Sequence, residues 1–134
     1  MDAVWSMTSL GSGRFNPVEK SSDMSDLRRD FSELRSRGEG YLEVRILDSE
    51  FPRLALSFCG DQAVIHLFTY EASVSLLVGD GATSPEATVD VPVMDESTTF
   101  TGDFVLGVDH AWEVVQKFAQ AQAFEELGEW RELQ

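Results

Sequence analysis

The clearest hydrophobic pattern in the chain lies near its C-terminal end. Between Asp109 and Leu127 apolar residues recur three and four positions apart, as they do on one face of an α-helix. Asp109 is a residue type that accepts hydrogen bonds from the free amides of a first helical turn, and Gly128 suits the left-handed position just past a helix end. The pattern therefore predicts a helix over 109–127 that lies across a sheet, with a short strand around Trp130 after it.

A second helical pattern lies closer to the N-terminus. Ser22 and Asp23 precede Met24, and apolar residues three and four apart continue until Gly38, which predicts a helix of about four turns. Ahead of it, Ala3 to Trp5 is compatible with a short edge strand, but the Ser-Leu-Gly-Ser-Gly run that follows has linker composition. Residues 1–17 are therefore expected to form a flexible or loosely held arm, and residues 18–134 a single domain.

From Gly40 onward the hydrophobic period changes from helical to two, which is typical of strands. The stretch 63–70 has apolar residues at both odd and even positions, so both of its faces are expected to be buried in the middle of the sheet. Pro92, in contrast, argues against an interior place for 88–93. The predicted strands cover 42–48, 54–58, 63–70, 74–78, 88–93 and part of 100–108. Short turns between them favour an α+β fold: an antiparallel sheet of five or six strands in a meander, with the N-terminal and C-terminal helices packed on one face.

The charge of the chain narrows the choice of partners. Ten basic residues against twenty-four acidic ones give a formal net charge of -14 at pH 7. Such a charge argues against nucleic acid or an anionic membrane surface as partner, because both are repelled. Cys59 is the one cysteine, which excludes an intramolecular disulfide and fits a reducing compartment. With neither a signal-peptide pattern nor an apolar run of membrane-spanning length, the chain is expected to be soluble and cytoplasmic.

Candidate chemistry is sparse. Cys59, His66 and His110 are the set from which a nucleophile and a base are conceivable, but a semi-buried thiol and an imidazole beside the core explain the first two more simply. The spacing of these residues does not resemble a zinc site, and the chain has neither a calcium-binding loop nor a phosphate-binding glycine loop. The expectation is a protein that is not an enzyme and that uses no cofactor or metal.

The distribution of charge is the most informative feature. The stretch from Leu54 to Gln116 has no lysine or arginine but contains ten acidic residues. Two interpretations stay open: a solvated acidic surface, or a docking surface that attracts a basic protein. On the second interpretation, the binding residues are carboxylates at strand ends and in loops, where a rigid scaffold presents side chains to a partner. The candidates are Glu71, Asp80, Asp90, Asp95, Glu96 and Asp103.

Several short patterns resemble a known family. They are the run from Phe100 to Val108, the Asp-started helix with Ala111 and Phe118, and the Gly-Glu-Trp sequence that ends at Trp130, together with a Pro-Arg-Leu turn at 52–54. In these patterns and in size the chain is similar to the first family of immunity proteins from bacterial polymorphic toxin systems. The resemblance covers most of the chain after Val18.

The resemblance implies a non-enzymatic inhibitor that binds a cognate toxin domain in the producing cell. Toxins paired with this family often act on nucleic acids, and deaminases are prominent among them. A nucleic-acid enzyme needs a basic substrate cleft, so an acidic inhibitor is a complementary partner for it. The alternative is a general acidic adaptor or a protein like a secretion chaperone, with no toxin partner. The identity of the toxin and the oligomeric state of the chain stay open.

Overall fold

The computed structural model describes residues 3–46, 50–70, 73–120 and 123–133, and it confirms the α+β class with a mostly antiparallel sheet and two helices. The strands are β1 (Ala3–Thr8), β2 (Phe15–Ser22), β3 (Glu39–Ile46), β4 (Arg53–Cys59), β5 (Gln62–Tyr70), β6 (Ser73–Leu77), β7 (Thr88–Val93), β8 (Glu96–Thr101), β9 (Leu106–Gly107) and β10 (Trp130–Leu133). The helices are α1 (Met24–Ser36) and α2 (Val108–Ala119), with short 3₁₀ turns η1 (Gly102–Phe104) and η2 (Phe124–Glu126).

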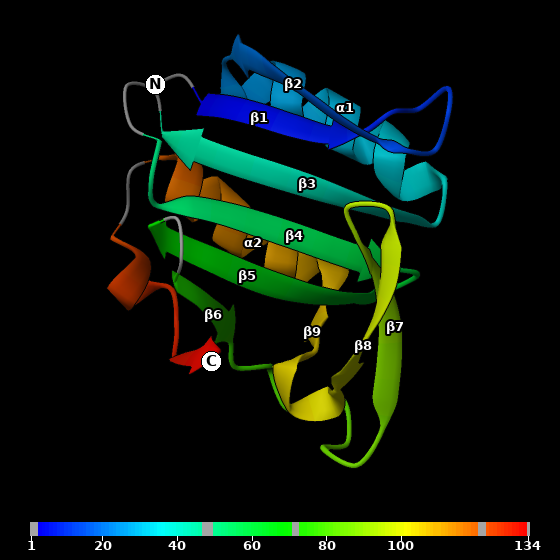
Figure 1. Ribbon diagram of the computed structural model, residues 1–134, viewed down its shortest axis with the longest axis vertical. Helices are drawn as coiled ribbons and strands as arrows, with labels where there is room; N and C mark the ends of the chain where they lie inside the picture. The colour runs from blue at the N-terminus through cyan, green and yellow to red at the C-terminus, as the bar shows by residue number, and fades with distance from the viewer. Residues whose placement is uncertain (1–2, 47–49, 71–72, 121–122, 134) are drawn as a thin grey trace.

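The main sheet has eight strands, more than the predicted five or six. Seven follow the order β10-β6-β5-β4-β3-β1-β2, and β9 pairs with β5 off this path. Strands β3 to β6 form the expected meander, in which β5 lies between β4 and β6. Strands β7 and β8 leave it and pair only with each other, and Figure 1 shows them crossing in front of the sheet.

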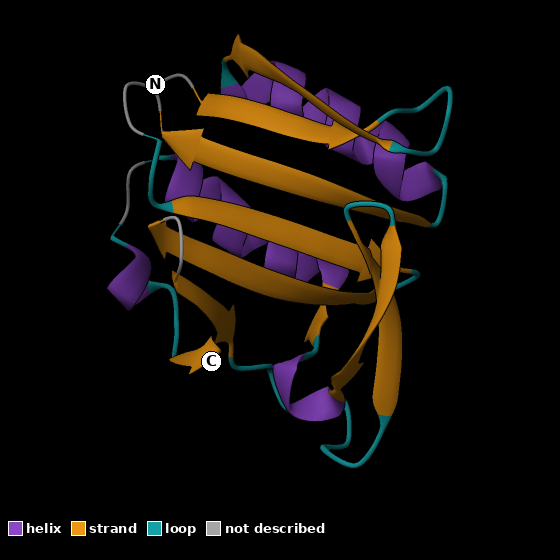
Figure 2. Ribbon diagram, in the orientation of Figure 1, coloured by secondary structure: helices purple, strands orange, loops and turns teal. Residues whose placement is uncertain are grey.

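One face of the sheet carries the main core. Along β3, β4 and β5 alternate residues such as Leu42, Leu56 and Ile65 are fully buried in one cluster with apolar residues of both helices. Phe31 of α1 stacks on Trp112 of α2, with ring centroids 4.4 Å apart. Figure 2 shows the two helices behind the sheet and the β7–β8 hairpin in front of it.

We call the opposite side the open face of the sheet. Successive side chains of a strand point to opposite faces, so the open face carries the alternate residues that do not enter the main core. Among them are Tyr41, Glu43, Ser57, Val64 and His66. The hairpin covers part of this face. No helix in the described part of the chain is both long and apolar enough to cross a membrane.

The expectation of a loosely held arm over residues 1–17 is wrong where the structure describes those residues. Strand β1 lies between β2 and β3, and Trp5 is only 2% exposed. Residues 3–8 alternate in period two, so Ala3, Trp5 and Met7 join the helix-side core. The glycine-containing run at 9–13 is the connection between β1 and β2 rather than a linker.

The C-terminal helix also differs from its prediction, because α2 ends at Ala119 rather than Leu127. Its N-cap is Gly107, and Asp109 makes no capping bond but pairs with Arg35. The Val108 amide bonds the Asp61 carbonyl instead, at 2.9 Å. After the helix the chain returns to the sheet, where β10 pairs with β6. Strand pairing and the packing of Trp130 on the core thus end the helix earlier than its sequence pattern predicts.

Candidate functional site

The β7–β8 hairpin lies over the open face because one of its sides is apolar. Val89 and Val91 are buried in a second cluster with Val64 of β5 and Leu76 of β6. Asp90 lies between the two valines and is exposed, as the period of two requires. The hairpin therefore presents Asp90 outward while its valines hold it on the sheet.

The hairpin is fixed at both ends. At its turn, the Asp95 carboxylate accepts a hydrogen bond of 2.7 Å from the backbone N–H of Phe15, at the start of β2. At its base, the Gly79 N–H donates to the carbonyl of Asp103 at 2.7 Å. A Cβ atom on Gly102 would overlap the Ser84 carbonyl, so this base accepts only glycine at that position. The acidic side chains are thus carried on an ordered support.

The structure divides the six predicted carboxylates into groups. Asp90 and Glu96 are exposed on the hairpin strands. Asp95 is exposed as well, but its hydrogen bond to Phe15 fixes the turn. Asp103 accepts a hydrogen bond from the Thr101 hydroxyl next to the base. Glu71 lies outside the described residues. Asp90, Asp95 and Glu96 all lie on the hairpin, whereas Asp80 and Asp103 lie near its base.

Asp80 has an internal role. Its carboxylate accepts hydrogen bonds from the amides of Gly107 and Ala82, both at 3.0 Å, and lies 3.6 Å from the His110 ring. Partial burial alone raises the pKa of Asp80, but the two amides and His110 more than offset this, and the net pKa is lowered. Asp80 therefore ties the loop after β6 to the start of α2.

Within the described ranges, no ion pair joins a lysine or arginine to a carboxylate of the hairpin. Among the described residues, every ion pair of a lysine or arginine uses Glu19, Asp26, Asp30, Glu43 or Asp109. Five of the eight basic residues before Leu54 form these pairs, with acids of the N-terminal half and with the first turn of α2. The carboxylates of Glu86, Asp90 and Glu96 face solvent with no such pair.

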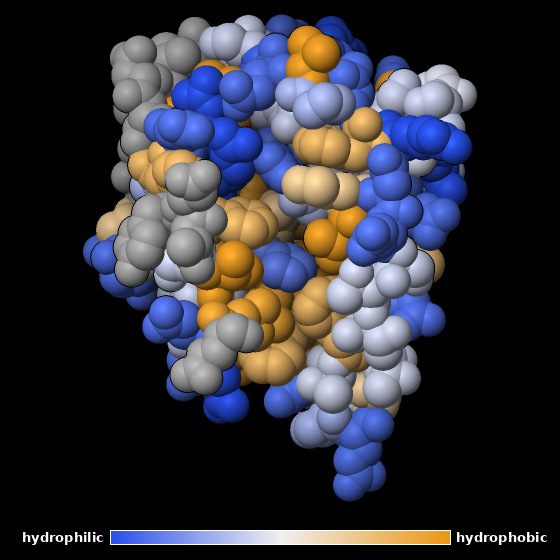
Figure 3. Space-filling view, in the orientation of Figure 1, coloured by the Kyte–Doolittle hydropathy of each residue, from blue (hydrophilic) through white to orange (hydrophobic). Residues whose placement is uncertain are grey.

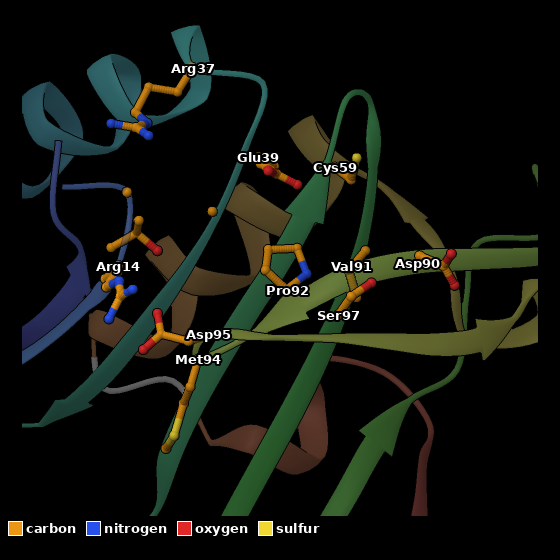
Figure 4. Close-up of a pocket in the computed structure, with 13 residues that line it drawn as sticks. Arg14, Arg37, Glu39, Cys59, Asp90, Val91, Pro92, Met94, Asp95 and Ser97 are labelled. Atoms are coloured by element: carbon orange, nitrogen blue, oxygen red, sulfur yellow. The ribbon is translucent and has the colours of Figure 1, made fainter. Parts of the chain in front are cut away.

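A cavity of about 580 Å³ lies on one side of the hairpin, toward the ends of β4 and α1. Its wall carries charges of both signs, from Arg14 and Arg37 and from Glu39, Asp90 and Asp95 (Figure 4). The Arg37 guanidinium donates to the Leu10 carbonyl and so holds the β1–β2 connection. The balance of charge in this cavity favours neither a simple anion nor a simple cation.

The three residues considered for catalysis are not brought together. Cys59 pairs with Gln62 at the end of the β4–β5 hairpin, whereas His66 pairs with Ala55 four residues further along the same two strands. His110 lies at the start of α2 beside Asp80. No group of three or more His, Cys, Asp or Glu side chains in the described ranges is arranged to hold a metal ion.

The open face contains a buried charge network that the sequence did not reveal. The Glu43 carboxylate accepts from the Tyr41 hydroxyl at 2.6 Å and from Arg53 at 3.1 Å, although its side chain is only 8% exposed. Burial and the neighbouring Glu43 raise the pKa of Tyr41 far above its usual range. Arg45 hydrogen-bonds Glu19 at 2.7 Å and thereby lowers the pKa of Glu19. Across β2, β3 and β4, the carboxylates of Glu19 and Glu43 thus alternate with the guanidinium groups of Arg45 and Arg53.

Beside this network the open face is apolar. His66 is 6% exposed, and its ring lies 5.3 Å from Phe100 and 6.3 Å from Phe68. Burial lowers the pKa of His66 to about 4, so the imidazole is neutral at pH 7. Figure 3 looks onto this face and shows hydrophobic residues gathered in a hollow beside the hairpin.

A smaller pocket opens on the open face at the hairpin turn. It has a volume of about 230 Å³ and is lined by Glu43, Glu50, Phe51, Arg53, Phe68 and Met94. We call it the Met94 pocket. Met94 also lines the larger cavity, so the turn of the hairpin separates the two.

Comparison of the chain with protein-family models, with curated proteins and with solved structures finds no match.

Proposed function

We propose that this protein is an immunity protein that binds and neutralises a toxin domain with a basic surface. The observation that carries the proposal is the β7–β8 hairpin, whose exposed carboxylates form no ion pair with a lysine or arginine within the described residues. A formal charge of -14 extends this acidic field over the molecule. The protein acts in the cytoplasm of the cell that makes the toxin, and it is a binder rather than an enzyme.

A nucleic-acid-acting toxin, such as a deaminase or nuclease, is the partner class that fits best. Its substrate is a polyanion, so its active-site cleft is positively charged. Carboxylates such as Asp90 and Glu96 can occupy phosphate positions in such a cleft and hydrogen-bond arginine side chains. Opposite potentials also accelerate encounter of the two proteins.

The fixed ends of the hairpin support the same proposal. A binding surface that is ordered before the partner arrives loses less conformational entropy on binding than a flexible loop does. The hydrogen bond between Asp95 and Phe15 and the base at Gly79 and Gly102 supply this order. Both helices are drawn behind the sheet, which leaves the hairpin side accessible (Figure 1).

Growth rescue tests the proposal. A set of nuclease and deaminase toxin domains, headed by any encoded beside this chain, is expressed in a bacterial host with and without this protein. The expected result is rescue from one toxin domain and a stable complex with it in pull-down with purified proteins. A complex without rescue points to an adaptor instead. Rescue by none of the domains, with binding no tighter than to an unrelated basic protein such as lysozyme, contradicts the proposal.

A further inference from the structure

We infer that the Met94 pocket receives an arginine side chain from the basic partner and forms the anchor of the interface. The inference rests on the proposed function and deepens it, because it names the contact that holds the partner once the acidic field has attracted it. Binding energy at protein interfaces is concentrated in a few residues that fill pockets, and arginine is among the residue types enriched there.

The size of the pocket points to one side chain. Sites for drug-sized ligands usually occupy roughly 300–1,000 Å³, whereas the Met94 pocket has about 230 Å³. Its walls are the side chains of Phe51, Phe68 and Met94, and carboxylates of Glu43 and Glu50 lie among them. An open recess with apolar and acidic lining residues suits a long side chain that has an apolar stem and a charged head.

The charges in the pocket favour a cation. Glu43 is already paired with Arg53, at 3.1 Å. The second acidic lining residue, Glu50, is exposed and has no ion pair among the described residues. The six lining residues thus carry two carboxylates against one guanidinium, and one added cation balances them.

One of the lining residues, Arg53, already contacts both an aromatic ring and a carboxylate in the pocket. The Arg53 guanidinium lies 5.9 Å from the centroid of the Phe51 ring while it pairs with Glu43. A planar guanidinium stacks on aromatic rings and bonds carboxylates through two donors at once, which a lysine ammonium does not. Phe68 and Glu50 offer a second aromatic ring and a second carboxylate to an incoming arginine.

Met94 supplies the remaining wall and is held outward. It is 48% exposed, and its φ of 57° is the one left-handed value among the described non-glycine residues. Bulky residues rarely adopt that conformation, and those that do concentrate at functional sites. The adjacent bond from Phe15 to Asp95 fixes the turn, so the thioether stays at the mouth of the pocket.

The direct test uses N-acetyl-arginine amide as the probe, with the neutral isostere N-acetyl-citrulline amide as the control. The ¹³C-labelled ε-methyl group of Met94, assigned with Met94→Leu, reports on binding by NMR. We expect saturable shifts at Met94 with the arginine probe and binding at least about fivefold weaker with the citrulline one. Glu50→Gln should raise the Kd by about two- to fivefold, the range for a partly exposed charge pair.

The matched control is Glu86→Gln, which removes the same charge from an exposed loop outside the pocket and should leave the Kd unchanged. Equal binding of both probes, shifts that bypass Met94, or equal effects of the two variants would each overturn the inference. The probe contains no toxin, so this outcome is separate from growth rescue. Rescue without arginine binding leaves the proposed function standing, and arginine binding without rescue leaves the pocket standing.

Discussion

The Asp95 carboxylate accepts a hydrogen bond of 2.7 Å from the backbone N–H of Phe15, eighty residues away in the chain. This bond joins the turn of the β7–β8 hairpin to the edge strand β2, across the open face of the sheet. The bond gives Asp95 a structural role, whereas the sequence predicted that Asp95 binds a partner. The neighbouring Glu96 is exposed and has no comparable tie.

Removal of this bond should loosen the hairpin turn more than it destabilises the whole fold. For Asp95→Ala we expect a loss of about 1 kcal/mol in the free energy of unfolding, because the bond is exposed and net hydrogen bonds contribute about that much. Amide hydrogen exchange at Phe15 should accelerate. Glu96→Ala is the matched control and should leave both quantities nearly unchanged; equal effects of the two variants would show that the bond does not restrain the turn.

The helix-side core should be sensitive at Phe118, which is 2% exposed and belongs to the main cluster. Phe118→Ala is expected to lower the free energy of unfolding by roughly 3–5 kcal/mol, because it removes buried area and leaves a cavity. Urea unfolding measures this loss. Glu113→Ala, on the exposed side of the same helix, should change stability by no more than about 0.5 kcal/mol. A small effect at Phe118 would contradict the described packing.

The open-face network should respond to loss of one charge. In Glu43→Gln the amide can still accept from Tyr41, but the Arg53 guanidinium loses its closest carboxylate. We expect a loss of about 1–3 kcal/mol, below the full cost of a buried unpaired charge because the Arg53 side chain is 25% exposed. Glu39→Gln on the same strand is exposed and serves as the control in urea unfolding. Equal stability of the two variants would show that the pair contributes little.

Stability should depend on pH through His66. Burial lowers the pKa of His66 from 6.5 to about 4, so the unfolded chain takes up a proton at a higher pH than the folded one. The contribution is fully present above about pH 6.5 and is lost as the pH falls toward 4, with a limit of about 3 kcal/mol. The difference in unfolding free energy between wild type and His66→Gln isolates this group from the carboxylates. A difference that stays constant over this window would rule out the shifted pKa.

The acidic hairpin should act mainly on the rate of encounter with the partner. In Asp90→Asn/Glu96→Gln we expect association with the toxin domain to slow by about two- to tenfold at low salt and to depend less on salt, with a smaller change in dissociation. Glu125→Gln/Glu126→Gln removes the same charge from the exposed turn η2 and is the control. Stopped-flow or surface-based kinetics at low and high salt measure both rates. Equal rates for the two double variants would mean that net charge, and not the hairpin, attracts the partner.

The sequence by itself determined much of the local structure. The helix α1 begins after Asp23, whose carboxylate caps it, and the strands from β3 to β6 follow the alternation of their apolar residues. Both features depend on near neighbours in the chain, which a pattern of three to eight residues records. The same alternation accounts for the exposure of Asp90 between the buried Val89 and Val91.

Tertiary structure decided the rest. Strand β1 became interior because β2 and β3 were available on its two sides, and α2 ended early because the chain after it pairs with β6. Asp80 and Asp95 were drawn into internal hydrogen bonds by amides of Gly107 and Phe15. The Met94 pocket joins Glu43 and three residues between 50 and 53 to Phe68 and Met94. Such contacts connect positions far apart in the chain, and the free energy that selects them comes from packing and pairing that no local pattern contains.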